Sequence, residues 1–427
     1  MTMREPQRRF LFASWEGGGN VPPLVQVARQ LVDRGHAVRV LGEPCHCAEF
    51  EGVGAAFASW RRAPHRFDRG NESEFLRDFE AKSPPQMLRR LGERLVFGPA
   101  AAYADDLRDE LAWRPDAIVV ADLLFGAMAA AEASRIPSAV FAPHVYGYPA
   151  PGLPAFGPGF APARGPLGRL RDALLTRVAM RTMAPFVPGF NALRARLGVA
   201  PVATAFEQVQ RLDRFLVATS RAFDYPGVTL PANVRHVGPL LGDPAWVEPW
   251  QSPWPASARD PLVLVGFSTT QQEQAAAMQR VVDALGALPV RGLATLGPAL
   301  DAGRLRLPAN VVACPSAPHA QILPRAAAVV THAGHGTTIR ALSAGVPLLC
   351  LPMGRDQNDT AARVVWHGAG LRLSPAASSR KIRRALTRLL AEPTFRDRAG
   401  QLGAAVRADA EDGRVVAELE GLAAGDG

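Results

Sequence analysis

A short apolar run, a glycine-rich loop, a segment with helical spacing and a second apolar run follow one another at the start of the chain. The apolar runs are residues 9–14 and 37–41, and residues 24–34 between them carry apolar side chains three and four positions apart. Gly35 stands where the predicted helix ends. This order is typical of a strand–helix–strand unit, whose two strands are parallel. The first segment therefore predicts an α/β fold.

The same alternation occurs again in both halves of the chain. Residues 115–121, 126–134 and 138–142 repeat it in the first half. In the second half, predicted strands and helices occupy residues 261–266, 275–285, 311–313, 326–331, 337–344 and 347–351. We expect two doubly wound, Rossmann-like domains that face each other across a cleft. In such sheets ligands bind at the carboxyl ends of the strands.

Proline-rich stretches mark the domain boundaries. Residues 239–261 carry several prolines and three tryptophans between the two α/β patterns. We therefore predict a first domain at 1–240, a linker at 241–260, and a second domain at 261–405. Residues 406–427 are expected to form a C-terminal helix that packs back on the first domain.

Residues 143–166 interrupt the first domain with a long loop rich in proline, glycine and aromatic side chains. Loops of this length in compact domains are usually functional or disordered. Because aromatic residues argue against disorder, we interpret the loop as one wall of an apolar binding cleft, with a purely structural surface loop as the alternative.

The composition excludes several classes of protein. The net charge is +9, but the arginines are scattered and form no basic stripe with interleaved aromatics, so nucleic-acid binding is not expected. The longest apolar stretch, residues 117–133, is interrupted by Asp122 and Glu132, so no membrane span is predicted.

Cysteine usage points to a reducing compartment. Four cysteines make no disulfide framework in a chain of 427 residues, which favours a cytoplasmic location. Cys45, His46 and Cys47 lie close together but do not complete a four-ligand zinc site. No metal is predicted, and the protein is expected to be a monomer or a homodimer.

The strongest local motif lies at residues 327–347, where a buried strand runs through His332 into a short loop and a helix. Gly334 and Gly336 allow a tight turn and a close approach of the backbone to a ligand. The helix is expected to open at Thr337 and Thr338, which are either cap residues or ligand contacts. The first turn of a helix presents unpaired N–H groups, and these bind anions such as a diphosphate.

Two further strand ends carry polar side chains. The sequence MGRDQND follows the strand at 347–351, and an adjacent carboxylate and amide are suited to binding vicinal sugar hydroxyls. The sequence VGFSTTQQEQ places Ser268, Thr269 and Thr270 after the strand at 261–266, where hydroxyls and amides can bind phosphate.

These motifs together resemble the nucleotide-sugar signature of inverting family-one glycosyltransferases, which have the GT-B fold. The resemblance rests on GFSTT, then APH, AQILPRAAAVVTHAGHGTT and GVPLLCLPMGRDQ, and is strongest with bacterial enzymes that modify natural products. It covers nearly the whole chain, because VRHVGPLLGD is similar to the interdomain junction of that family. It implies transfer from a TDP- or UDP-sugar to a small, mostly apolar acceptor, without a metal or other cofactor.

The resemblance also implies a role for each matching residue of the second domain. The positions that match diphosphate contacts are Ser268, Thr269, His332, Gly334, Gly336, Thr337 and Thr338. Asp356 and Gln357 match the sugar-binding pair, and Ala317 and His319 lie in the segment that recognises the nucleobase. Ser316 and His319 replace residues that plant members carry there, so the base stays open between uracil and thymine.

The first domain departs from the family at the catalytic base. The family has a histidine after the first strand, paired with an aspartate about a hundred residues later. Asn20 stands in the histidine's place and Asp122 matches the aspartate. An asparagine cannot act as a base near neutral pH, although it can orient a hydroxyl or a water.

Three explanations follow from Asn20. In the first, another residue is the base, with Asp122 the first choice and Glu16 and His144 as alternatives. In the second, the acceptor is acidic or an amine and needs little activation. In the third, the chain binds nucleotide sugar without efficient transfer. The rival functions are accordingly an auxiliary or sensor protein that binds nucleotide sugar, and a nucleotide-sugar epimerase of the same fold. A dinucleotide oxidoreductase is disfavoured, because the loop GGGN lacks the G-x-G-x-x-G spacing.

Overall fold

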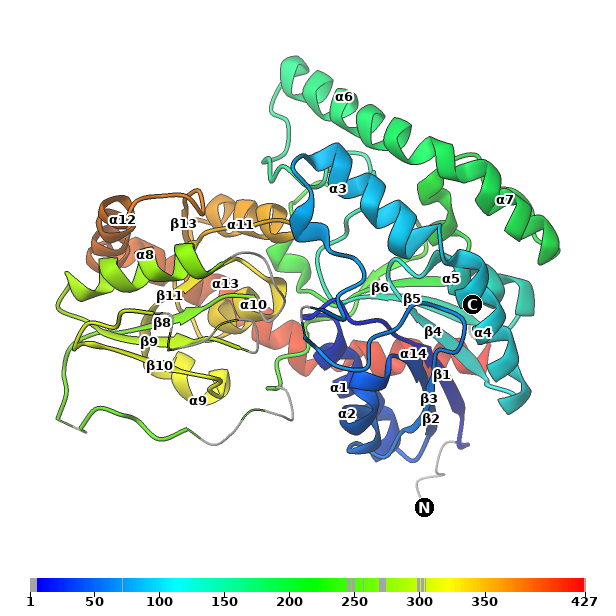
Figure 1. Cartoon of the computed structure of the whole chain (residues 1–427), viewed down its shortest axis with the longest axis horizontal. Helices are drawn as coiled ribbons and strands as arrows, with labels where there is room; N and C mark the ends of the chain where they lie inside the picture. The colour runs from blue at the N-terminus through cyan, green and yellow to red at the C-terminus, as the bar shows by residue number, and fades with distance from the viewer. Residues whose placement is uncertain are drawn as a thin grey trace.

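The computed structural model contains two parallel β-sheets, each flanked by helices (Figure 1). It describes residues 6–70, 72–243, 247, 250–255, 257–268, 274–297, 300, 303 and 305–425. The first sheet has seven strands in the order β3-β2-β1-β4-β5-β6-β7, and the second has six in the order β10-β9-β8-β11-β12-β13. Both orders are those of doubly wound folds, so the predicted fold class is confirmed.

The strands of the first sheet are β1 (Arg9–Ala13), β2 (Ala37–Gly42), β3 (Ala56–Ser59), β4 (Ala117–Ala121), β5 (Ser138–Ala142), β6 (Arg214–Val217) and β7 (Val234–His236). Those of the second are β8 (Leu262–Gly266), β9 (Arg291–Thr295), β10 (Val311–Cys314), β11 (Ala326–Thr331), β12 (Leu348–Cys350) and β13 (Gly370–Arg372). Both sheets are covered on their two faces, which explains why β4, β5 and β8 are apolar and buried along their whole length.

The helices of the first domain are α1 (Val21–Asp33), α2 (Cys47–Glu51), α3 (Pro84–Leu91), α4 (Ala100–Glu110), α5 (Phe125–Ser134), α6 (Pro166–Met183) and α7 (Val187–Arg196). The remaining helices are α8 (Ala275–Gly286), α9 (His319–Ile322), α10 (His335–Ser343), α11 (Gln357–Trp366), α12 (Ser379–Ala391), α13 (Pro393–Glu411) and α14 (Arg414–Ala424). Among the described helices, none is both long and apolar enough to cross a membrane.

The topology of each sheet decides where its ligands bind. The strand order reverses between β1 and β4 in the first sheet, and between β8 and β11 in the second. A crevice opens at the carboxyl ends of the strands at such a reversal. Asn20 and Asp122 follow β1 and β4, whereas Ser268 and His332 follow β8 and β11. The predicted site residues therefore come from the two crevices.

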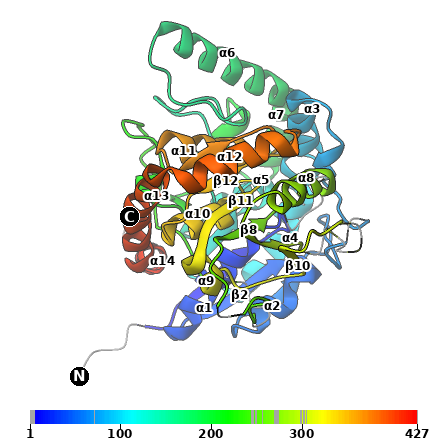
Figure 2. The same cartoon turned by 90° about the vertical axis from the view of Figure 1, so that its left-hand side faces the viewer.

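The C-terminal helices connect the two domains. Helix α13 packs in the second-domain core through Ala399, Leu402 and Val406, so the boundary expected at residue 405 lies inside this helix. Helix α14 then packs in the first-domain core through Val415, Leu419 and neighbouring apolar residues. Figure 1 shows the two red helices passing from one domain to the other, and Figure 2 shows them in succession along one side of the molecule.

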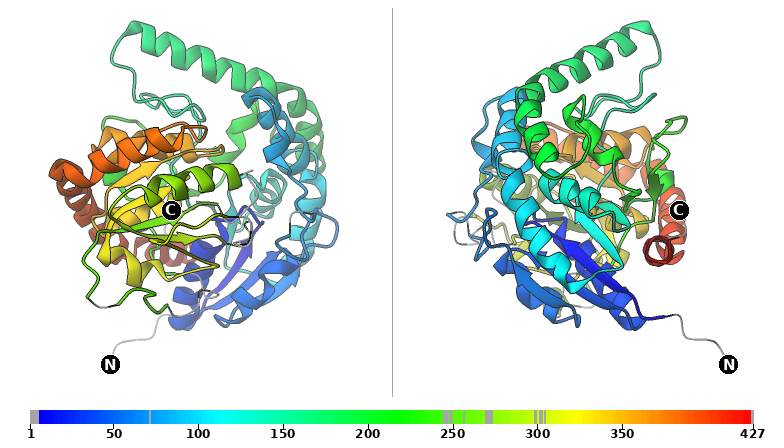
Figure 3. Two further views of the ribbon diagram at one scale, coloured as in Figure 1. Left: turned by 60° about the vertical axis from the view of Figure 1, so that its left-hand side comes forward. Right: turned by 90° about the vertical axis from the view of Figure 1, so that its right-hand side faces the viewer.

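The sequence did not predict α2, α3, α4, α6 or α7, and two of these helices, α3 and α6, line the site. Helix α6 follows directly on the loop that was expected at 143–166, and it packs against α3. Figure 3 shows α6 at the margin of the molecule in both views. Both helices contribute side chains to the cleft described below.

Candidate active site

One cavity lies between the two domains, with a volume of about 1760 Å³. Its second-domain wall contains Ser268, Ala317, His319, His332, Gly334, Gly336, Thr337, Asp356 and Gln357, and its first-domain wall contains Glu16, Asn20, Asp122 and His144. The structure thus brings together most of the residues that the sequence singled out. Thr269 lies outside the described residues.

The loop between β11 and α10 is shaped by one strained residue and one glycine. Ala333 has a φ of 67°, a left-handed conformation that is unfavourable for a residue with a side chain. A Cβ atom on Gly334 would lie only 2.4 Å from Nε2 of His332, so no larger residue fits there. A Cβ on Gly336 would meet only the end of the Arg340 side chain, at 3.3 Å. The glycine is therefore required at 334 and not at 336.

Helix α10 begins at His335, two residues earlier than expected, with Gly334 as its N-cap. Thr337 consequently lies in the first turn, where it lines the cavity. Thr338 is fully buried and does not line the cavity, so its predicted contact with the diphosphate is not supported. His335, Gly336 and Thr337 of the first turn line the cavity. The first N–H groups of a helix have no partners inside it, as an anion site requires.

The histidines of this site are neutral. Burial lowers the pKa of His332 to about 4, and burial followed by the charge of Arg340 lowers the pKa of His319 to about 4. Burial also lowers the pKa of His335, which the sequence analysis had passed over, to about 3. The Nε2 atom of His335 lies 2.8 Å from Oγ1 of Thr219 in the first domain. An anion at this place would be bound by N–H groups rather than by positively charged imidazoles.

The sugar-binding pair predicted at the end of β12 opens helix α11. Asp356 is the residue before this helix, and the Oε1 atom of Gln357 accepts hydrogen bonds from the backbone N–H groups of Met353 and Gly354. Gln357 therefore also holds the shape of its own loop. Both residues line the cavity.

The two alternative bases Asp122 and His144 form a single pair. Oδ2 of Asp122 lies 3.4 Å from Nε2 of His144, and Oδ1 accepts hydrogen bonds from the hydroxyl of Tyr148 and from the N–H of Leu123. The Nδ1 atom of His144 lies 2.8 Å from the carbonyl oxygen of Val145, which is a pure acceptor, so Nδ1 carries a proton. When Nε2 is protonated as well, both ring nitrogens are donors and the imidazole cannot accept a proton.

The charge of this pair follows from its surroundings. Burial lowers the pKa of His144, but the hydrogen bond and the negative charge of Asp122 outweigh it, and the pKa rises to about 9. Near neutral pH His144 is thus an imidazolium beside a carboxylate. The negative charge of Asp356, in the opposite domain, contributes to the same shift.

The side-chain amide of Asn20 bonds to the backbone of its own loop. Its Oδ1 atom accepts a hydrogen bond of 2.9 Å from the N–H of Gly17, and its Nδ2 atom donates one of 2.8 Å to the carbonyl of Trp15. The asparagine closes the loop after β1 on itself. The expected role of orienting a hydroxyl or a water is therefore not supported by its contacts.

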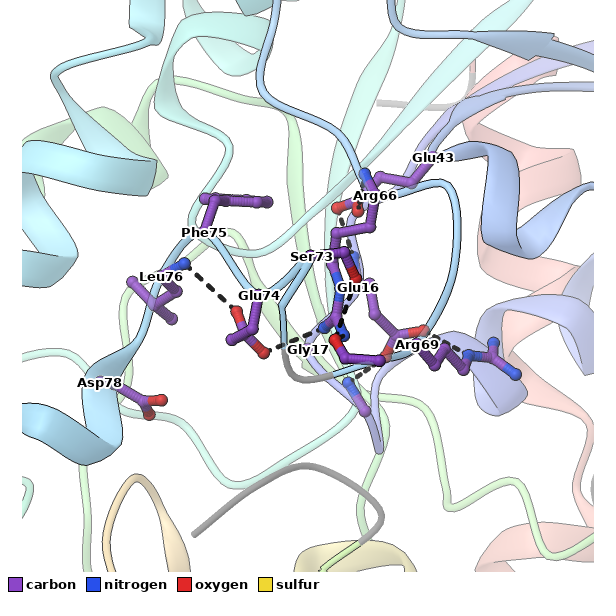
Figure 4. A network of polar contacts seen from close by, with 12 residues as sticks. Glu16, Gly17, Glu43, Arg66, Arg69, Ser73, Glu74, Phe75, Leu76 and Asp78 are labelled. Carbon is purple, nitrogen blue, oxygen red and sulfur yellow. Dashed lines mark hydrogen bonds and ion pairs between the residues drawn. The ribbon is translucent and has the colours of Figure 1, made fainter. Parts of the chain in front are cut away.

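Glu16 is a structural carboxylate rather than a free base. It is buried, and it lies 3.1 Å from His46. It also binds Arg69 at 2.7 Å (Figure 4). Burial raises the pKa of Glu16, but His46 and Arg69 outweigh this effect and hold the pKa at about 2. A carboxylate with so low a pKa, paired with an arginine, is a weak proton acceptor.

Among the described residues, Glu16, Cys45 and His46 also form a group whose possible metal ligands lie within 4.8 Å of one another. Burial and the charges of Glu16 and Glu43 raise the pKa of Cys45 to about 12, so in the absence of a cation this side chain is a thiol. Arg69 already occupies Glu16 and opposes a second cation. The group does not suit a metal ion.

Two residues that the sequence analysis missed shape the site. Tyr148 lies in the aromatic loop and holds Asp122, 26 positions earlier. Arg355 lies within the quoted sequence MGRDQND, but nothing in the sequence indicates that its partner is Asp78, 277 positions away. Such long-range pairs leave no local pattern.

The acceptor side of the cavity is apolar. Side chains from α3, from α6 and from the loop at 143–165 line it, among them Leu88, Leu91, Leu153, Phe156, Met180 and Met183. The predicted role of the aromatic loop as a cleft wall agrees with this lining. Pockets of this kind bind drug-sized apolar molecules.

Comparisons with known proteins agree with this geometry. Residues 279–422 match the erythromycin biosynthesis protein CIII-like C-terminal domain. The chain is 33% identical over 410 residues to 4'-demethylrebeccamycin synthase of Lentzea aerocolonigenes, covering 92% of this chain and 94% of that protein.

Two solved structures share the fold over almost the whole chain. The glycotransferase of kitacinnamycin superposes with a TM-score of 0.75 at 23% identity, covering 97% of this chain and 99% of that one. The calicheamicin glycosyltransferase CalG4 gives a TM-score of 0.74 at 22% identity, with 98% of both chains covered.

Proposed function

The chain belongs to the family-one glycosyltransferases of natural-product biosynthesis, and on this premise we propose that it transfers a sugar from a TDP- or UDP-sugar to a small, mostly apolar acceptor with inversion at the sugar carbon. The observation that carries the proposal is the cavity between the domains, which is lined from the second domain by a helix start suited to anions and from the first by a carboxylate–imidazole pair. No metal takes part in the proposed reaction.

The donor lies on the second domain in this proposal. Its diphosphate binds the first turn of α10 and the loop after β8, its sugar contacts Asp356 and Gln357, and its base lies near Ala317 and His319. His332 and His319 are neutral, so in this arrangement they contact the nucleotide through hydrogen bonds and do not neutralise its charge.

The acceptor is activated by Asp122. As the acceptor oxygen forms a bond to the anomeric carbon, its proton passes to the Asp122 carboxylate. The bond between that carbon and the phosphate oxygen breaks, and the nucleoside diphosphate leaves with the electron pair. Attack from the face opposite the leaving group inverts the configuration.

His144 keeps its proton throughout. Its Nδ1–H donates to the carbonyl of Val145, and its Nε2–H faces Asp122, so it orients the carboxylate and places a positive charge beside the base. Tyr148 fixes the other carboxylate oxygen. In this proposal the enzyme needs no histidine at position 20, because Asp122 itself is the base.

The apolar lining supports an acceptor of drug size with little charge. We propose that the enzyme works in the cytoplasm, since all four cysteines are unpaired.

The test is a thermal-unfolding panel followed by a transfer assay. TDP, UDP, GDP, ADP and NAD are each added at about a hundred times a typical dissociation constant, at which a true ligand stabilises the native state by about 2.7 kcal/mol. We expect a shift with TDP or UDP only, and glycosylation of an apolar phenol or macrolide panel with the matching sugar. A shift with NAD alone, or none with either pyrimidine nucleotide, would contradict the proposal.

A further inference from the structure

Arg355 joins the two walls of the cavity directly. It belongs to the second domain and immediately precedes Asp356 and Gln357, yet all three of its guanidinium nitrogens donate to the first domain. Nε and Nη2 bind the two oxygens of Asp78 at 2.6 and 2.9 Å, and Nη1 binds the carbonyl of Gly17 at 3.0 Å. A bidentate pair of this kind fixes both distance and orientation.

The backbone on each side of this pair is strained. Arg355 has a φ of 53°, and Arg77, the residue before Asp78, has a φ of 48°. Left-handed conformations are unfavourable for residues with side chains, and they persist where the surroundings demand them. The carboxylate is also perturbed, because the charge of Arg355 outweighs burial and lowers the pKa of Asp78. The chain thus adopts two unfavourable turns at the points where it makes this contact.

The two first-domain partners of Arg355, Gly17 and Asp78, lie beside one polar network, which Figure 4 shows. Glu43 accepts hydrogen bonds of 2.8 Å from the backbone N–H of Glu16 and from that of Arg66. Arg66 binds Glu74 at 2.9 Å, and Glu74 accepts from the N–H of Leu76, two residues before Asp78. The loop after β1 and the segment that carries Asp78 are therefore held together.

The same network reaches the proposed base. Trp15, at the start of the loop, donates a hydrogen bond of 2.9 Å from Nε1 to the carbonyl of Asp122. Asn20 ties the end of the loop back to Trp15 and Gly17. The loop that contains Gly17 therefore contacts Asp122 at one point and Arg355 at another. Arg355 in turn precedes the sugar-binding pair Asp356 and Gln357.

We propose that Arg355 is a positioning residue, which through Asp78 and Gly17 sets the placement of the donor sugar against Asp122 when the cleft is closed. This inference rests on the proposed function. It assigns Arg355 no contact with the donor: its guanidinium is already engaged by the first domain. Placement errors of about 1 Å reduce rates by up to about a hundredfold, so the contact has a kinetic consequence.

The experiment compares Asp78→Asn, Arg355→Lys and a control, Asp409→Asn, in the full-length protein. Asp409 accepts hydrogen bonds from Ser220 and from the N–H of Arg221, so the control weakens another contact between the domains. It does not line the cavity. Steady-state kcat and KM for the donor are measured, together with the Kd of TDP and UDP by calorimetry.

We expect Asp78→Asn to lower kcat about ten- to a hundredfold while the nucleotide Kd changes less than about threefold. Arg355→Lys keeps the charge but not the bidentate geometry, so it should lose nearly as much. It also leaves no buried carboxylate without a cation, which protects against misfolding. Asp409→Asn should retain the kcat of the unmodified enzyme.

Two results would overturn the inference. An unchanged kcat in Asp78→Asn would show that the contact is not needed for the reaction. A loss of nucleotide affinity of about tenfold in Arg355→Lys, with none in Asp78→Asn, would show that Arg355 binds the donor directly.

A second measurement separates this inference from the proposed function. Small-angle scattering with saturating TDP or UDP reports the closure of the cleft without any turnover. The unmodified protein should become more compact than Asp78→Asn, and equal radii of gyration would contradict the positioning role. Absence of nucleotide binding in the unmodified protein would instead contradict the proposed function.

Discussion

The carboxylate–imidazole pair at Asp122 and His144 is the part of the molecule in which single atoms matter most. Each of its four hydrogen-bonding atoms has an identified partner within the first domain. The pair therefore keeps a defined geometry before any acceptor binds, as is required of a base that must meet one hydroxyl.

Replacement of Asp122 by asparagine should abolish transfer and spare nucleotide binding. The amide keeps the shape and the hydrogen bonds from Tyr148 and Leu123 but cannot accept a proton. Loss of a general base typically costs about a hundred- to ten-thousandfold in rate. Steady-state kinetics and calorimetry with TDP and UDP measure the two effects separately, and retained turnover would remove Asp122 from the base role.

The pH dependence should report the charge of His144. Because its pKa is raised to about 9, the imidazolium is present below that pH and is lost as the pH rises through it. We expect kcat to fall above about pH 9, and His144→Gln to be slower and to lack this fall. An activity that instead rises through pH 9 would mean that neutral His144 is the base.

The same raised pKa has a consequence for stability. The folded protein binds the proton more tightly than the unfolded chain, so the contribution of the pair is complete below about pH 6.5 and is lost as the pH rises through about 9. The difference in thermal midpoint between the unmodified protein and His144→Gln should shrink over this interval.

At the scale of elements, the junction between β11 and α10 is the part of the fold on which the proposed donor binding depends. Its strand is buried along almost its whole length, its loop contains the strained Ala333, and its helix begins immediately at His335. The short loop leaves the first helical turn facing the cavity, and Gly334 provides the space that His332 needs.

Gly334→Ala should weaken nucleotide binding by about ten- to a hundredfold. The added Cβ would lie 2.4 Å from Nε2 of the buried His332, so the ring or the loop must move, and overpacking of this kind costs about 1–3 kcal/mol. Gly336→Ala is the matched control, because its Cβ meets only a flexible arginine end. Calorimetry should give the control a Kd close to that of the unmodified protein; similar losses in both would refute the steric explanation.

At the scale of the whole molecule, the domains are joined on two sides. The C-terminal helices carry the chain from the second core to the first, and Arg355 spans the cavity. Helix α14 contributes Val415, Leu419 and Leu422 to the core that also contains residues of β1 and β2, although these strands lie at the other end of the sequence. The first domain is therefore completed by residues from the end of the chain.

Leu419→Ala should lower the free energy of unfolding by about 2–5 kcal/mol, because this fully buried side chain would leave a cavity in the first core. Leu170→Ala, on the exposed face of α6, is the control and should change stability by less than about 0.5 kcal/mol. Urea unfolding compares the two. A loss below about 1 kcal/mol for Leu419→Ala would mean that α14 is not part of that core.

Local patterns in the sequence determined the strands and helices that surround the site. The strands β5 and β11 have the predicted bounds, and β1, β4, β8 and α8 differ by at most two residues at either end. This success has a physical reason, since buried parallel strands are continuous apolar runs and their helices follow at fixed spacing. The side chains at strand ends could be assigned to one edge for the same reason.

The tertiary structure alone decided which of these side chains interact. The sequence offered Asp122, His144 and Glu16 as alternatives, whereas the fold pairs the first two and encloses Glu16 with His46 and Arg69. It also turned Thr338 into the core by starting α10 two residues early. Charge states and partners depend on distances between segments up to 277 residues apart, and no local periodicity encodes such distances.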